Sequence, residues 1–299
     1  MKKSTKIALI TAISLVAAGC LLGAAAYGLG GSFERELHEV THTADEPFTD
    51  ISVSVSEADV HILPSKDGSC YAVCEETDRV RYELAVTDGT LTLALVDNRH
   101  WYDFIGISIG TPTVTLYLPQ GAYNRLTAES QSGQIHGSFK TDTGLSFTNV
   151  TLKSSSGKIS FAGKVKTLTA ENTAGDVILT DLTAETIYTK TSSGAILFAD
   201  IHANETTTEA TSGRIHFTRT IVAGTLTAKS SSGNIKFEAS DAKDLILTSQ
   251  SGNITGSLLS DKLFDADSNS GNITCPAPKG DGTCRVRTSS GNISLIVLG

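Results

Sequence analysis

Ser230-Ser231-Ser232-Gly233-Asn234-Ile235-Lys236-Phe237 is one copy of a motif that recurs, with variation, nine times in the second half of the chain. Each copy is centred on a glycine that follows serine or, in one copy, alanine. Successive glycines are separated by 24, 18, 19, 19, 20, 19, 19 and 20 residues. A nearly constant period of this length indicates a repeat architecture. The nine glycines are Gly133, Gly157, Gly175, Gly194, Gly213, Gly233, Gly252, Gly271 and Gly291.

The residues around each glycine predict two strands joined by a tight turn. Isoleucine or valine stands two residues after every glycine, and phenylalanine or leucine stands four residues after it in most copies. A spacing of two is the periodicity of a strand and not of a helix. Because glycine accepts a positive φ without steric cost, we expect a left-handed backbone at these nine positions.

The position four residues before each glycine carries charges whose sign alternates along the chain. The first six are Glu129, Lys153, Glu171, Lys190, Glu209 and Lys229. In coils stacked about 4.8 Å apart, equivalent residues become neighbours, and opposite charges there contribute about 0.2–1 kcal/mol per pair. The sequence therefore predicts an all-β fold, a parallel β-solenoid (β-helix) of coils of about 19 residues over residues 122–299, with this charge ladder on its outside.

The N-terminus predicts a membrane anchor. Residues 1–6 are basic, and residues 7–31 contain no charged side chain. About 20 apolar residues suffice to cross a bilayer as a helix, and the lysines favour a cytoplasmic N-terminus. We therefore expect a single-pass protein of the cell membrane with an extracytoplasmic C-terminal domain and a linker over residues 32–46. The alternatives are a lipoprotein acylated at Cys20, and signal-peptidase cleavage at Ala24-Ala25-Ala26.

Residues 47–121 predict further β-structure that lacks the repeat period. Apolar and polar residues alternate over 51–55, 59–63, 71–73, 82–86, 91–95 and 114–118. Asp88-Gly89 is typical of a hairpin turn. Because the open end of a solenoid invites the addition of further strands, we expect these irregular strands to cap it.

This region, together with the repeats, resembles a known family. The resemblance is carried by Ile51-Ser52-Val53, Ala58-Asp59-Val60-His61-Ile62, Asp88-Gly89-Thr90-Leu91-Thr92-Leu93 and Val114-Thr115-Leu116-Tyr117-Leu118-Pro119, followed by the Ser-Gly-x-Ile repeats. They are similar to the DUF4097 family, whose members carry the name putative adhesin. The resemblance implies a membrane-tethered β-solenoid on a bacterial surface. Because relatives occur beside regulators of envelope stress, it also implies an alternative role as an accessory or sensor in that response, acting through a membrane partner.

Composition and motifs argue against nucleic-acid binding and against catalysis. The net charge of −8 would repel nucleic acid. The Ser-Gly turns lack the Gly-x-Ser-x-Gly pattern of a nucleophile elbow, and solenoid enzymes that act on polysaccharides need a local carboxylate cluster. We therefore expect a non-catalytic adhesin or interaction scaffold with an unknown protein or glycan ligand, no metal and no cofactor. A polysaccharide-active enzyme is the less favoured alternative.

Four cysteines raise the question of disulfides. Cys275 and Cys284 both fall on inward positions that flank one turn, where either a disulfide or two buried thiols would fit. Cys70 and Cys74 would lie roughly 13 Å apart on a continuous strand, too far to bridge. Metal binding by this pair is a weak hypothesis because no histidine is nearby in the sequence. We expect Cys70 and Cys74 to be structural thiols.

Aromatic residues and histidines complete the candidate sites. Trp101, Tyr102 and Phe104 lie in a predicted loop, where they form either an exposed contact patch or an apolar plug over the end of the solenoid. The seven histidines do not cluster in the sequence and are expected to be solvated surface residues.

Overall fold

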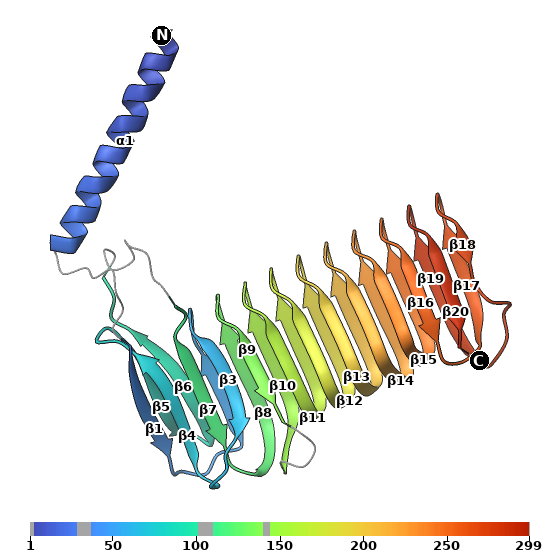
Figure 1. Cartoon of the computed structure of the whole chain (residues 1–299). Helices are drawn as coiled ribbons and strands as arrows, with labels where there is room; N and C mark the ends of the chain where they lie inside the picture. Colours follow the sequence, from blue (N-terminus) through green and yellow to red (C-terminus); the bar gives the residue numbers. More distant parts are fainter. Residues whose placement is uncertain (1–2, 29–36, 101–109, 140–143, 299) are drawn as a thin grey trace.

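Strands paired in parallel make up most of the chain, as the repeat predicts (Figure 1). The structure is a computed structural model and describes residues 3–28, 37–100, 110–139 and 144–298. The repeat region begins with β8 (Gly121–Ser130), β9 (Ile135–Ser138), β10 (Leu145–Ser154), β11 (Ile159–Asn172), β12 (Val177–Thr191), β13 (Ile196–Ala210), β14 (Ile215–Ser230), β15 (Ile235–Ser249) and β16 (Ile254–Leu258). The predicted parallel β-solenoid is confirmed.

The core is a set of apolar columns that run along the solenoid. Each long strand joins two glycine turns and alternates buried with exposed side chains. Phenylalanines four residues after the glycines stack on one another, with ring centroids of Phe198 and Phe217 4.8 Å apart and those of Phe217 and Phe237 4.7 Å apart. Because burying one such side chain stabilises the fold by about 1.5–3 kcal/mol, the repeated register multiplies this contribution.

The turn glycines are required by close stacking and not, as expected, by a positive φ. None of the nine, all of which lie in the described ranges, has a left-handed backbone. Instead, each approaches the turn of the neighbouring coil. A Cβ on Gly213 would overlap the carbonyl oxygen of Gly194, and a Cβ on Gly194 would overlap that of Gly175. The expectation was wrong because the positive φ values occur at the other bend of the coil, at Asp181, Asp200, Arg219 and Ala239.

Buried hydroxyl groups three residues before the glycines connect successive turns. The Oγ of Ser154 accepts a hydrogen bond from the Gly157 N–H at 3.0 Å and donates one to the carbonyl oxygen of Gly133 at 3.4 Å. Ser249 makes the same two bonds, at 2.8 Å and 3.4 Å, in a later coil. Since buried backbone groups must be hydrogen-bonded, these hydroxyls have a structural role.

The strands before the repeats cap one end of the solenoid, as expected, but they stack out of sequence order. β2 (Asp50–Ser54) and β3 (Asp59–Pro64) form a coil that pairs with β8 and β9 on one side. On its other side it pairs with β6 (Thr90–Asp97) and β7 (Thr113–Leu118). β4 (Cys70–Glu76) and β5 (Val80–Thr87) then pair antiparallel with β7 and β6.

β1 (His38–Ala44) corrects the prediction of a linker over residues 32–46. This strand pairs antiparallel with β4 along its whole length. Val40, His42 and Ala44 are half-buried, whereas the residues between them are exposed. The inward residues of this strand recur every second position in the sequence, but one of them is the polar His42, which obscures the pattern.

The last two coils are exchanged relative to the sequence. β17 (Lys262–Ser268) and β18 (Ile273–Thr274) form the outermost coil (Figure 1). β19 (Gly282–Thr288) and β20 (Ile293–Val297) lie between that coil and the coil of β15 and β16. The inserted coil buries Val286 and Leu295 completely, whereas Ile273 of the outer coil remains 44% exposed. The coil with the more apolar interior is therefore covered on both sides.

A buried ion pair accompanies this exchange. Lys262 in β17 is only 3% exposed, and its Nζ lies 3.0 Å from Oδ1 of Asp241 in β15. In register, Lys262 pairs with Gly282 of the inserted β19. A Cβ at Gly282 would come within 3.1 Å of the Lys262 side chain. The lysine thus reaches across the inserted coil because that coil has no side chain at this position.

α1 (Lys3–Gly28) precedes the strands. Its described apolar side chains are exposed, for example Leu15 at 68% and Leu21 at 71%. Within the described ranges, no helix combines the length and the apolarity needed to span a membrane. The transmembrane anchor over residues 7–31 stays a prediction.

Replacing Gly213 by alanine tests the glycine column. The added methyl group would push two backbone turns apart, so we expect the free energy of unfolding to fall by about 1–3 kcal/mol. Gly121→Ala is the matched control, because its Cβ would meet Tyr123 at an ordinary 3.8 Å; we expect a change within about 0.5 kcal/mol. Equal midpoints of chemical denaturation for the two variants would contradict the column.

Replacing Lys262 by alanine removes the buried cation from the Asp241 carboxylate, whose side chain is 13% exposed. Breaking a buried pair in this way costs about 3–5 kcal/mol, and hydrogen exchange in β17 should become faster. The control is Lys279→Ala, which removes a partner that is 79% exposed from its pair with Asp261; the expected loss is under about 1 kcal/mol. If both variants lose the same stability, the buried pair does not hold the outer coil.

Candidate interaction surface

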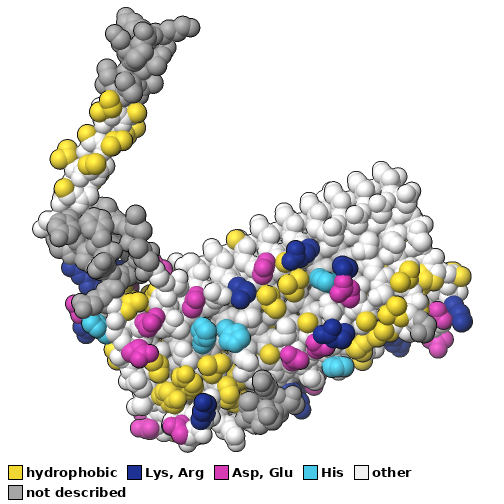
Figure 2. Space-filling model, viewed as in Figure 1, with side chains coloured by type: hydrophobic (Ala, Val, Ile, Leu, Met, Phe, Trp, Pro, Cys, Tyr) yellow, Lys and Arg dark blue, Asp and Glu magenta, His cyan; other side chains and the backbone are white. Residues whose placement is uncertain are grey.

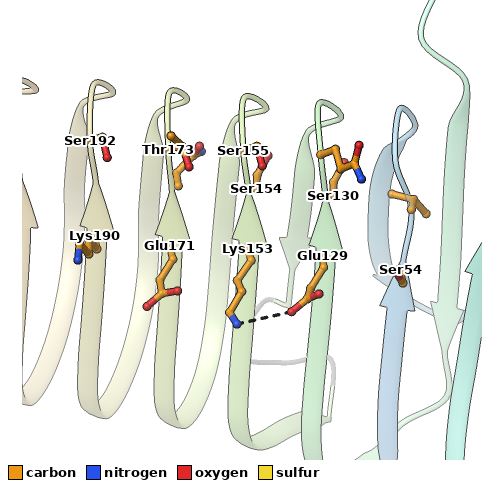
Figure 3. A pocket seen from close by; sticks show the side chains of 13 residues that line it. Ser54, Glu129, Ser130, Lys153, Ser154, Ser155, Glu171, Thr173, Lys190 and Ser192 are labelled. Carbon is orange, nitrogen blue, oxygen red and sulfur yellow. Dashed lines mark ion pairs between the residues drawn. The ribbon is translucent and has the colours of Figure 1, made fainter.

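A shallow groove of about 500 Å³ runs across the outward face of the coils beside the charge ladder (Figure 3). The ladder residues occupy one row, and the hydroxyl and amide groups near the turns occupy a second row beside it. The groove is lined by Ser54, Val55, Glu129, Ser130, Gln131, Lys153, Ser154, Ser155, Glu171, Asn172, Thr173, Lys190 and Ser192.

Register pairing places opposite charges on consecutive strands, as the sequence predicts. Lys153 pairs with Glu129 on one side and with Glu171 on the other. The Nζ of Lys153 lies 3.6 Å from Oε1 of Glu129, and the Nζ of Lys229 lies 3.3 Å from Oε1 of Glu209. The side chains of Lys153 and Glu129 are 48% and 50% exposed, so each pair contributes at most about 1 kcal/mol. Their charges remain accessible to a partner.

The ladder offers the same chemical groups at regular intervals. Ionic and hydroxyl groups repeat with the strand spacing of about 4.8 Å, and extended surfaces of stacked repeats suit elongated partners. Charges of both signs are interspersed on the visible face of the molecule (Figure 2). The surface can therefore form ion pairs and hydrogen bonds along a polymer without strong attraction for one sign of charge.

Two stacked tyrosines on the capping strands were not predicted from the sequence. Tyr117 on β7 pairs in register with Tyr71 on β4 and with Leu63 on β3. The two tyrosine rings stack with centroids 4.5 Å apart. No local pattern predicts that β4 and β7 are neighbours, so the pair could not be found from the sequence. The predicted contact patch of Trp101, Tyr102 and Phe104 lies outside the described residues.

Two histidines that are far apart in the sequence are neighbours in the structure. β3 and β9 pair His61 with His136, and their ring centroids are 5.6 Å apart. His136 is half-buried, and its Nδ1 lies 2.8 Å from Oγ of Ser160. Burial, then His61 and Lys158, lower the pKa of His136 below its ordinary value. The histidines were expected not to cluster because sequence distance does not reveal which coils stack.

Cys275 and Cys284 are free thiols in the structure. Cys284 is fully buried, and Cys275 is half-buried against the same core. Burial, followed by the nearby Cys275, raises the pKa of Cys284 to about 12. The disulfide between them stays a prediction.

A group of three potential ligands, two buried and one half-buried, lies in the N-terminal cap. His42 on β1 and Cys74 and Glu76 on β4 hold one nitrogen, one sulfur and one oxygen atom within 4.8 Å of one another. The Nε2 of His42 lies 2.7 Å from Oε1 of Glu76, which also accepts the Tyr82 N–H at 2.9 Å. Sequence reasoning placed no histidine near Cys74. His42 and Glu76 are 34 residues apart, and only the pairing of β1 with β4 joins them.

Comparison with known proteins identifies relatives of the fold. The model of the Toastrack DUF4097 family matches residues 48–295. The crystal structure of a putative adhesin from Parabacteroides merdae has a TM-score of 0.55 at 13% identity and covers 88% of this chain and 98% of that chain. A putative adhesin from Parabacteroides distasonis has a TM-score of 0.53 at 13% identity, covering 88% of this chain and 99% of that chain. No curated protein matches the chain.

Acidification is expected to destabilise the fold through His136. Because its pKa is lower in the folded chain than in the unfolded chain, the unfolded state binds the proton more readily, and stability falls as the pH drops through about 6.5. His136→Gln should reduce the loss of stability measured between about pH 7.5 and about pH 5.5. His202→Gln, at an exposed position, should leave that loss unchanged. An unaltered pH profile for His136→Gln would refute this role.

Proposed function

The chain belongs to the Toastrack DUF4097 family, and we propose that it is a non-catalytic surface solenoid that serves adhesion or acts as an interaction scaffold. In this proposal the charge ladder and the exposed turn residues beside it, Gln131, Ser155, Thr173 and Ser192, form the contact surface. The partner is an elongated polar molecule, either a glycan or a segment of another protein.

The observation that carries the proposal is the regular and open form of the groove. Half-exposed charges of alternating sign stand on consecutive strands, next to hydroxyl groups of the turns. Sites for small substrates are concave and mostly apolar, whereas this surface is shallow and polar. The adhesin names of the two fold neighbours are consistent with this function.

We also propose that the solenoid lies outside the cell membrane and is held there by the N-terminal segment. Residues 7–31 contain no charged side chain and follow three lysines. The mass of the chain isolated from membranes distinguishes two forms of attachment. An intact N-terminus would support a retained segment, whereas loss of residues 1–19 with a lipid on Cys20 would show a lipoprotein.

Binding of the full chain to a glycan array and to solubilised membrane proteins tests the contact surface. The double variant Glu171→Gln/Lys190→Gln removes two groove charges with little change of shape, and we expect at least about tenfold weaker binding, equivalent to about 1.4 kcal/mol. The matched control is Lys166→Gln/Glu185→Gln. It neutralises a pair 3.7 Å apart on the same two strands but outside the groove, and we expect unchanged binding.

The bound molecule decides between the functions. Glycan binding would support adhesion, and capture of one specific membrane protein would favour the accessory or sensor of envelope stress. Release of new reducing ends from a bound polysaccharide would instead show an enzyme. Equal binding by the groove variant and its control would exclude the ladder as the contact surface.

A further inference from the structure

We propose that His42, Cys74 and Glu76 form a binding site for one Zn²⁺ ion. The three side chains offer a ring nitrogen, a thiol sulfur and a carboxylate oxygen, all within 4.8 Å of one another. Zinc accepts all three ligand types. Mg²⁺ and Ca²⁺ prefer oxygen ligands alone, and the sulfur therefore favours a softer ion.

The pairing of β1 with β4 brings the three ligands together. Cys74 and Glu76 are two residues apart on β4 and so lie on one face of the sheet. Cys74 is opposite Val40 of β1. Along the strands, Cys74 therefore lies between His42 and Glu76. The imidazole and the carboxylate reach toward each other, and their Nε2 and Oε1 atoms are 2.7 Å apart.

The surroundings of the three ligands suit a buried ion with one open coordination position. Cys74 is completely buried, and the side chain of Glu76 is 9% exposed. His42, whose side chain is 25% exposed, is the most accessible of the three ligands. Three protein ligands with a fourth position for water are typical of an accessible zinc site. The thiolate and the carboxylate would balance both charges of the ion, which limits the cost of burying it.

A neighbouring group orients one of the ligands. The backbone N–H of Tyr82 donates a hydrogen bond of 2.9 Å to Oε1 of Glu76, and such second contacts fix the geometry of metal-binding carboxylates. Zinc bonds of about 2.0–2.3 Å would require small side-chain rotations from the present arrangement. The ion would then bridge His42 and Glu76 in place of their direct hydrogen bond.

An ion at this position would attach β1 to the rest of the cap. Within the described part of the chain, β1 pairs with β4 alone, so it is an edge strand. A bond from His42 through the metal to Cys74 and Glu76 would link the two strands through their side chains. Zn²⁺ should therefore slow hydrogen exchange of the β1 amides at least about tenfold, because metal binding contributes to folding stability.

Titration with Co²⁺ as a spectroscopic substitute tests the site in the full chain after removal of metals by a chelator. We expect one Co²⁺ per chain, a thiolate-to-cobalt absorption band, and displacement by Zn²⁺. His42→Gln and Cys74→Ser should each weaken binding at least about tenfold, and Cys74→Ser should abolish the absorption band. His42→Gln should also remove the effect of Zn²⁺ on hydrogen exchange in β1.

Two control variants make the test specific. Cys70→Ser changes a buried thiol four residues away on the same strand, and His61→Gln changes a histidine outside the group; both should bind Co²⁺ like the wild type. If Cys74→Ser fails to fold, the partly exposed His42→Gln variant decides the matter. No stoichiometric binding by the folded chain, or an equal loss in Cys70→Ser or His61→Gln, would overturn the proposal.

Discussion

The close approach of successive backbone turns is the constraint on which the whole solenoid depends. Each turn glycine lies so near a backbone carbonyl oxygen of a neighbouring turn that no side chain fits between them. This contact fixes the register of neighbouring coils. The phenylalanine columns inside and the charge ladder outside both follow from that register, because equivalent residues then lie one strand spacing apart. A surface of evenly spaced polar groups is a consequence of the same contact.

The two ends of the solenoid share one solution to the problem of unpaired strands. At each end, the coil nearest the terminus in sequence is covered by a coil that is farther from it. β2 and β3 lie beneath β6 and β7, and β19 and β20 lie beneath β17 and β18. The two inner coils, β2 with β3 and β19 with β20, are therefore paired on both sides. An exposed strand edge favours aggregation. At the N-terminal end, the antiparallel β4 and β5 cover the edge of the outer coil.

The period, the strand positions and the charge ladder could be predicted from the sequence because each is a local pattern repeated many times. Ile196, Phe198 and Lys190 occupy the inward or outward positions that their distance from Gly194 indicates. The reason for the glycines was predicted wrongly, because a turn that needs a positive φ and a turn that needs close stacking select the same residue.

Features that depend on which coils are neighbours could not be predicted. The approach of His42 to Cys74, of Tyr71 to Tyr117, and of Lys262 to Asp241 each results from one pairing that occurs once in the chain. Repetition gives no information about such a pairing.

Engineered disulfides test the stacking register and the coil exchange most directly. Thr248 pairs with Arg287, and Arg287 pairs with Asp267. Neighbouring strands about 4.8 Å apart are within disulfide range, whereas the roughly 9.6 Å across two coils is too far. The structure predicts that Thr248→Cys/Arg287→Cys forms a cross-link on oxidation, identified by mass spectrometry of the joined peptides, and that Thr248→Cys/Asp267→Cys does not. A cross-link in the second variant only would mean that the coils stack in sequence order.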